Sequence, residues 1–191
     1  FVINNYMAED NFIQSVQDSA GDAPQSIKWY RNKIREFGKP APLDLIRDGR
    51  RTTRVSAFNL NMFVYDPKYK KTLPYYDTFP LVLPLERYSD GFLGLNFHYL
   101  PIPLRVRLLD KINTIPQDNQ YNAGEQLRIN YARARTLPMA KAVIKRYLYG
   151  HLKSQIRVVM PDEWVIAVLL PVQRFKKAST SKVYNETKKM F

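Results

Sequence analysis

The chain has 191 residues, a formal net charge of +13 and no cysteine. This length suits one domain with arms, and the lack of cysteine excludes disulfides and thiolate metal sites and is typical of a reducing compartment. Hydrophobic residues make up 45% of the chain, enough for a core, yet no apolar run approaches the roughly 18 residues of a membrane span.

The first 56 residues predict an arm, a helix and a linker. Residues 1–25 are polar, acidic and rich in turn formers, so we expect a flexible acidic arm. Ser26 then precedes residues 27–37, whose apolar side chains recur at helical spacing, and Gly38 follows as a stop signal. Residues 39–56 contain two prolines and several arginines without a clear period, which predicts a basic linker outside the domain.

Residues 57–172 are predicted to form an α+β core that begins with a small antiparallel sheet or open barrel. Apolar and polar residues alternate over 58–64, and 79–85 and 92–99 predict two more strands joined by a turn at Asp90-Gly91. Pro84 either weakens the end of its strand or places that end at a sheet edge, because proline cannot donate a ladder hydrogen bond.

The second half of this core is predicted to be helical. The helices are expected over 101–115, 123–134 and 139–153. The apolar runs 156–160 and 164–170 are interpreted as a returning hairpin. Residues 173–191 are polar and basic, so we expect a tail that contacts a partner or moves freely.

The positive charge is concentrated in the segments that flank a neutral centre. Residues 28–54 hold nine bases and three acids, and 128–157 hold eight bases and no acid, whereas 55–127 hold seven of each. Because soluble surfaces usually mix both signs, this segregation favours contact with a polyanion. Nucleic acid is the preferred partner, and an acidic protein surface is the alternative.

The predicted phosphate contacts are bases of these two segments. They are Arg47, Arg50, Arg51, Arg54, Arg133, Arg135, Lys141, Lys145 and Arg146. Tyr75 and Tyr76 lie near three lysines, a mixture of rings and cations found in proteins that stack bases on aromatic side chains. The competing interpretation of these tyrosines is a structural loop beside the core.

The sequence offers little for catalysis. His98 and His151 are far apart and show no metal-ligand spacing, so His98 is interpreted as a packed or edge residue and His151 as part of the predicted helix over 139–153. A nucleophile motif and a phosphate-binding glycine loop are both missing. Asp162, with Glu186 and Lys188 later in the chain, resembles the acid pair and lysine of a metal-dependent nuclease site. Glu186 and Lys188, however, fall in the polar tail, where no strand is predicted. We therefore expect no enzyme, metal or cofactor.

Several runs in the chain resemble a known family. They are Tyr65-Asp66-Pro67-Lys68, Leu73-Pro74-Tyr75-Tyr76-Asp77, Phe79-Pro80-Leu81-Val82 and residues 91–101, with residues 26–31, Trp164 and Arg174-Phe175 extending the likeness. They resemble small virion proteins of contractile-tailed phages of the T-even type, which are labelled DNA end protectors. The resemblance implies a structural virion protein, in the head–neck or tail region, that shields the end of the packaged genome.

Charge and resemblance together predict a protein that binds the end of packaged DNA without reading its sequence and without catalysis. Other virion proteins are expected as partners, self-association is left open, and no membrane contact is expected. The alternative is a purely structural neck, tail or baseplate subunit whose basic segments bind other virion proteins.

Overall fold

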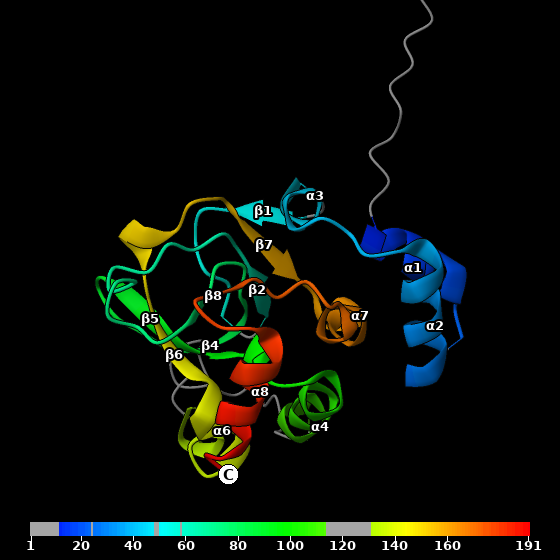
Figure 1. Ribbon diagram of the computed structural model, residues 1–191. Helices are drawn as coiled ribbons and strands as arrows, with labels where there is room; N and C mark the ends of the chain where they lie inside the picture. The colour runs from blue at the N-terminus through cyan, green and yellow to red at the C-terminus, as the bar shows by residue number, and fades with distance from the viewer. Residues whose placement is uncertain (1–11, 24, 48–49, 58, 114–130) are drawn as a thin grey trace, which may run out of the picture.

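The computed structural model describes residues 12–23, 25–47, 50–57, 59–113 and 131–191. These residues form an α+β fold around a six-stranded antiparallel open sheet, which confirms the predicted class (Figure 1). In spatial order the strands are β1 (Arg50–Thr52), β7 (Ile156–Val159), β2 (Leu60–Met62), β4 (Leu81–Arg87), β5 (Gly91–Asn96) and β6 (Ile144–Leu148). A separate pair joins β3 (Tyr76–Asp77) to β8 (Phe175–Lys176).

The helices lie mainly on one side of this sheet. Those described are α1 (Phe12–Ala20), α2 (Ile27–Phe37), α3 (Pro42–Arg47), α4 (Ile102–Asn113), α6 (Pro138–Val143), α7 (Trp164–Leu169) and α8 (Thr180–Lys188), with short 3-10 helices η1 (Phe97–Tyr99), η2 (Tyr149–His151) and η3 (Pro161–Glu163). Helix α7 contacts α2 and α4 and lies between the α1–α2 pair and the sheet (Figure 1). This position explains why most of its residues are buried.

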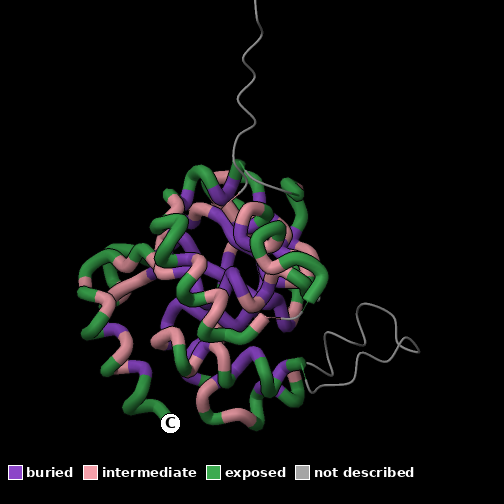
Figure 2. Tube along the Cα trace, turned by 90° about the vertical axis from the view of Figure 1, so that its right-hand side faces the viewer, coloured by how far each residue is buried: buried purple, intermediate pink, exposed green. Residues whose placement is uncertain are grey.

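The sheet separates two cores, as its two-residue side-chain period requires. Leu81, Leu83 and Leu85 of β4 point into the larger core under the helices. Val82 points to the other face and joins a smaller core that includes Phe63 and Tyr147. The buried residues of both cores fill the interior of the molecule (Figure 2).

Local signals place α2 as expected. The Ser26 side chain accepts a hydrogen bond from the Trp29 N–H at 3.1 Å, which satisfies a helix-end donor. Gly38 ends the helix with φ of 89°, a conformation that favours glycine. Helix α4 likewise covers most of the range predicted for it.

The predicted arm, linker and tail each contribute to the folded unit, contrary to expectation. Part of the arm forms α1, because Ile13 and Val16 on one helical face enter the core. Within the linker, α3 buries Leu45 and Ile46, and β1 pairs with β7. The tail forms β8 and α8, which buries Val183. A few apolar side chains at the right spacing therefore anchor segments that are polar on average.

Three further predictions from the sequence are wrong. Of the two alternatives for Pro84, the sheet edge is wrong: β4 lies between β2 and β5, and its pairing with β5 is irregular between Pro84 and Glu86, where a missing N–H is tolerated. The helix predicted over 139–153 ends at Val143, and the chain continues as β6, so His151 lies in η2. The predicted hairpin is instead β7 followed by helix α7. Of the helix predicted over 123–134, residues 123–130 lie outside the described residues, and 131–134 are helical.

Candidate nucleic-acid interface

The two basic segments lie at opposite edges of the sheet, which curls between them. Arg50 and Arg51 belong to edge strand β1, and Lys145 and Arg146 belong to edge strand β6. Strands β2 and β6 are three spacings apart, about 14 Å in a flat sheet. Yet the ring of Phe63, just after β2, lies 5.5 Å from the ring of Tyr147 in β6. The sheet must therefore be strongly curved around the smaller core.

Two glycines in β5 permit the close packing that accompanies this curvature. A Cβ atom on Gly91 would lie 1.9 Å from the carbonyl oxygen of Tyr147, and one on Gly94 would lie 2.3 Å from the Val82 side chain. Any other residue would push neighbouring strands away. The sequence run that contains both glycines is thus a packing requirement and not a phosphate-binding loop.

Cationic and aromatic side chains from three separate segments lie at one end of the sheet. Arg87 is opposite Phe92 on the face of the smaller core, whereas Arg146 is opposite Leu93 on the other face. We define the basic rim as Arg54, Arg87, Tyr88 and Arg146. The Arg87 guanidinium, at the end of β4, donates through Nη2 to the carbonyl oxygen of Val55, the residue after Arg54. The next residue, Tyr88, has its ring 4.2 Å from the guanidinium carbon of Arg146. Contacts of this kind fix the guanidinium planes while leaving polar edges open to a ligand.

Arg135 lies beside this rim. Its guanidinium carbon is 5.3 Å from the Tyr131 ring centroid. Partial desolvation, Glu86 and the nearby Tyr131 raise the pKa of Tyr88, so its phenol stays neutral at physiological pH. Its single O–H donor is already bonded to the Glu86 carboxylate, so Tyr88 contributes to the rim mainly through the ring that stacks against Arg146.

Two acids lie within reach of the rim: Glu86, which bonds to Tyr88, and Asp90. Arg146 pairs with Asp90, whose side chain is 65% exposed. Exposed pairs of this kind contribute only about 0–1 kcal/mol. A phosphate group, with more negative charge and more acceptor oxygens, can therefore replace Asp90 at little cost.

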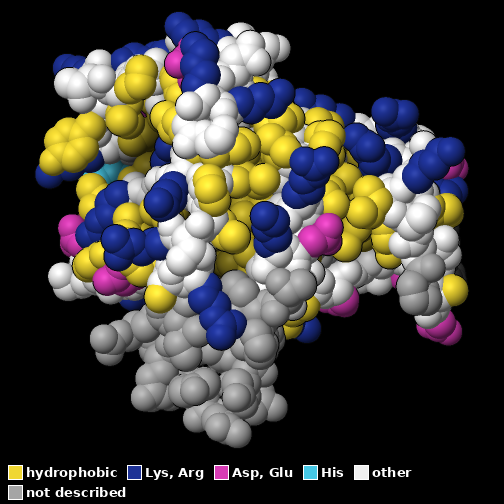
Figure 3. Space-filling model, turned by 90° about the horizontal axis from the view of Figure 1, so that it is seen from below, with side chains coloured by type: hydrophobic (Ala, Val, Ile, Leu, Met, Phe, Trp, Pro, Cys, Tyr) yellow, Lys and Arg dark blue, Asp and Glu magenta, His cyan; other side chains and the backbone are white. Residues whose placement is uncertain are grey.

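Most of the other predicted bases are exposed but lie outside the rim. Arg47 ends α3, Arg50 and Arg51 lie on β1, Arg133 precedes α6, and Lys141 lies on α6. On the face seen in Figure 3, Lys and Arg side chains are spread widely with few acids between them. The structure thus places these five on the surface without bringing them into one cluster.

Lys145 and the two predicted stacking tyrosines are only partly accessible. The Lys145 Nζ lies 4.4 Å from the centroid of the Tyr99 ring and donates to the Ala142 carbonyl at 3.2 Å, and burial lowers its pKa. Tyr75 is half-buried, with its ring 6.1 Å from that of Tyr99. Tyr76 is half-buried in β3, paired with Lys176. These three side chains are held against protein groups.

His98 is fully buried in a polar network, as its interpretation as a packed residue requires. Its Nδ1 lies 3.0 Å from Asp77 Oδ2, and Asp77 Oδ1 accepts from the backbone N–H groups of Phe79 and Arg174 at 3.0 and 3.1 Å. Burial lowers the pKa of His98, so the ring is neutral. Burial alone would raise the pKa of Asp77, but His98 and the two N–H bonds outweigh it and lower the pKa. The pair joins β3 to η1, and the bond from Arg174 to Asp77 ties β3 to the segment before β8.

Two arginines that contribute to the net charge are buried inside the protein and bonded to protein groups. Arg105, on α4, is fully buried and donates to the carbonyls of Leu100 and Leu170, to the Gln173 side chain and to the Tyr184 hydroxyl. Arg157, on β7, is also fully buried and pairs with Glu163 at 3.1 Å. Both act as structural connectors and cannot reach an external phosphate.

The nuclease-like residues do not form a site. Asp162 lies in η3, whereas Glu186 and Lys188 lie on α8, where Glu186 pairs with Lys189 at 2.9 Å. Among the described residues, no group of three or more His, Asp or Glu side chains is arranged to hold a metal ion. Within the same part of the chain, no helix is long and apolar enough to cross a membrane.

Sequence reasoning missed Arg87 and Tyr88 because they lie in the region where positive and negative charges balance. The signal that identifies them is their position. They lie at the end of a strand, just before the turn at Asp90-Gly91, and residues at a strand end project beyond the sheet. Charge summed over long segments hides such local arrangements.

Exposed guanidinium groups beside tyrosines, on a basic α+β fold, are the features of a nucleic-acid-binding protein. The family comparison agrees with this class. Residues 2–190 match the family model of the phage T4 terminal DNA protecting protein, and the chain belongs to that family. No curated protein and no solved structure shows significant similarity to it. The family resemblance, the absence of an enzymatic role and the function in DNA end protection are thereby confirmed, and the chain is a phage protein associated with packaged DNA.

Proposed function

We propose that the basic rim is the surface through which this protein holds the end of packaged duplex DNA, without reading its sequence. The observation that carries the proposal is that Arg54, Arg87 and Arg146, from three separate segments, all lie at the same end of the sheet. Guanidinium groups bind phosphate oxygens in a bidentate manner. Phosphate contacts position a protein on DNA but carry no base information, which suits a protein that must accept any end.

The bases outside the rim extend this surface on both sides. Arg47, Arg50 and Arg51 follow the β1 edge, and Arg133, Arg135 and Lys141 lie toward α6. Tyr75, Tyr76 and Lys145 are secondary candidates, because each is already packed against protein groups. In the particle, the proposal puts the protein at the genome end in the head–neck region, in contact with other virion proteins and open to self-association.

A salt titration with blunt-ended linear and closed circular DNA tests the proposal. With six to ten phosphates engaged, the affinity of the wild type for linear DNA falls by about 10³–10⁵ between about 50 and 200 mM salt. The triple variant Arg54→Ala, Arg87→Ala, Arg146→Ala binds more weakly, and its log–log salt slope is smaller by about 2.7, or roughly 0.9 for each lost phosphate contact.

A second triple variant controls for net charge. Lys28→Ala, Arg31→Ala and Arg35→Ala remove the same charge from exposed positions of α2. We expect this variant to keep nearly the whole salt slope. Equal losses in both variants would show that total charge, and not the rim, governs binding. Equal affinity of the wild type for linear and circular DNA would contradict end recognition, and binding only to acidic virion proteins would favour a purely structural subunit.

A further inference from the structure

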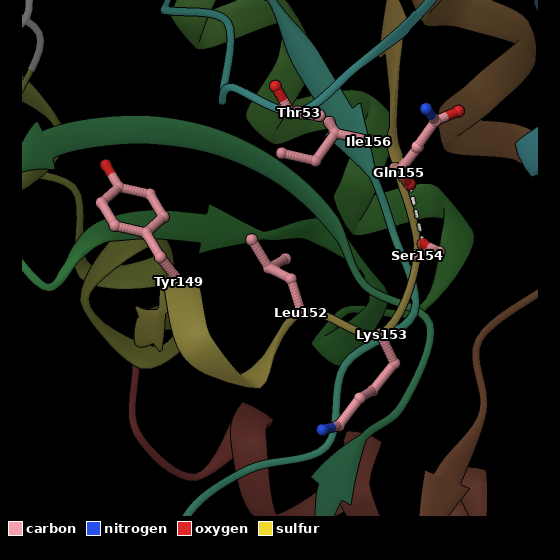
Figure 4. Close-up of a pocket in the computed structure, with 7 residues that line it drawn as sticks. All are labelled: Thr53, Tyr149, Leu152, Lys153, Ser154, Gln155 and Ile156. Carbon is pink, nitrogen blue, oxygen red and sulfur yellow. Dashed lines mark hydrogen bonds between the residues drawn. The ribbon is translucent and has the colours of Figure 1, made fainter.

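Beside the basic rim the surface contains an open hollow of about 590 Å³. It lies between Thr53, just after β1, and the connection from η2 to β7. The side chains that line it most directly are Thr53, Tyr149, Leu152 and Ile156 (Figure 4). Lys153 also belongs to this segment, but its side chain extends in the opposite direction (Figure 4). The volume falls within the range of small-molecule sites, about 300–1,000 Å³.

The hollow has the chemistry of a surface on which a flat ring can stack. The Tyr149 ring is held from behind by Phe92, with centroids 5.9 Å apart and planes at 32°. Its backbone N–H donates to the carbonyl oxygen of Asp90 at 3.0 Å, which ties it to the hairpin end that carries the rim. Leu152 supplies apolar contact over the buried Ile156, while Thr53, Ser154 and Gln155 supply polar groups at the margin.

The hollow is directly connected to the rim along the chain and through space. Thr53 precedes Arg54, and Tyr149 lies three residues after Arg146. In space, the Tyr149 N–H bonds to Asp90, the residue paired with Arg146, so a phosphate held by Arg54 or Arg146 would place its own nucleotide next to the hollow. Bases leave a duplex most easily where stacking is already incomplete, and a terminal base has a neighbour on one side only.

We propose that this hollow receives the terminal nucleobase of the DNA end, stacked on Tyr149, while the basic rim holds the adjoining phosphates. The inference rests on the proposed function of the rim and adds the feature that distinguishes an end from continuous DNA. An internal base must lose stacking on both sides before it can enter, so circular DNA reaches the rim but not the hollow. Polar groups on both sides of an open hollow accept any base, in agreement with sequence-independent binding.

Duplexes with altered ends test this inference. The probes are linear duplexes with a matched terminal pair, a mismatched terminal pair or ends closed by hairpin loops. Opening a base-pair step costs about 1.4 kcal/mol, a factor of about ten in affinity. The wild type therefore binds the mismatched end about tenfold more tightly than the matched end, and the closed end most weakly.

Two variants test whether the hollow is responsible. Tyr149→Ala removes the stacking ring and lowers affinity for open ends by about 5- to 150-fold, the equivalent of 1–3 kcal/mol. Tyr149→Phe keeps the ring and retains the preference for mismatched ends. Thr53→Phe fills the hollow from an exposed position without disturbing the Tyr149–Phe92 contact, so it abolishes that preference even if the alanine variant folds poorly.

The outcomes separate this inference from the function on which it rests. Salt-dependent binding that is weakened by the rim variant but does not respond to end type would overturn the role of the hollow and leave the rim in place. A preference for mismatched ends that survives in both Tyr149→Ala and Thr53→Phe would overturn it as well. Loss of DNA binding altogether in the wild type would instead reject the proposed function.

Discussion

The basic rim and the buried connector Arg105 use the same side chain in opposite ways. In the rim, Arg146 lies on an exposed strand edge between a tyrosine ring and an exposed carboxylate, and it can exchange partners. Arg105 is surrounded by the protein oxygens of five residues and cannot exchange any of them. Both arginines count equally in the net charge. Burial and the type of hydrogen-bond partner therefore determine which cations can bind a ligand, and the number of bases in a segment does not.

The largest effect is expected from removing the buried connector. Arg105→Ala leaves the carbonyls of Leu100 and Leu170 without their donor, and each unsatisfied buried group costs about 1–3 kcal/mol. We expect the free energy of unfolding, measured in urea, to fall by about 3–5 kcal/mol. The exposed neighbour on the same helix, Arg107→Ala, should change it by no more than about 0.5 kcal/mol. A small loss of unfolding free energy in Arg105→Ala would show that the buried connector stabilises the fold no more than an exposed arginine does.

An intermediate effect is expected from pH, acting on the buried network and not on the rim. The pKa of His98 is lowered by burial, so its contribution to stability is complete above its ordinary value near 6.5 and is lost as the pH falls toward the lowered pKa. The pKa of Asp77 is also lowered, so its contribution is lost only as the pH falls below about 3.8. Unfolding free energy should therefore decline in two stages on acidification.

The variant His98→Gln identifies the first stage. Glutamine can still donate to Asp77 but does not titrate, so the decline between about pH 7 and pH 5 should become smaller. His151→Gln, in η2 and half-buried against the Asp66 carbonyl, lies outside the His98–Asp77 network and is the matched control, so it should leave that decline unchanged. If His151→Gln removes the first stage and His98→Gln does not, the buried pair is not the origin of the acid sensitivity.

The smallest effect is expected from Asp90, the carboxylate that pairs with Arg146. Asp90→Asn removes the carboxylate that competes with phosphate for Arg146, so DNA affinity should rise by up to about fivefold, the equivalent of an exposed pair of about 1 kcal/mol. Asp66→Asn changes the same charge at an exposed pair with Lys70 outside the rim. The rise is measured by titrating labelled linear DNA. An equal rise in both variants would show that only net charge matters.

Helices and strands with local signals could be predicted from the sequence alone. The Ser26 cap, the helical spacing of 27–37 and Gly38 sufficed for α2. Two apolar runs separated by a strong turn sufficed for the β4–β5 hairpin. These features depend on residues within one helical turn or one pair of strands, so neighbouring residues contain the information. The basic, non-catalytic character and the family resemblance were also readable at this level.

The positions and burial of the cationic side chains depend on the tertiary structure. Residues 144–148 have helical spacing, yet they form edge strand β6 because β5 offers a ladder of hydrogen bonds to pair with. Strand pairing then places Arg54, Arg87 and Arg146 at one end of the sheet, while Arg157 turns inward to Glu163. These outcomes depend on contacts between residues far apart in the chain. Local spacing and charge counts cannot contain them, because pairing and burial are set by the whole fold.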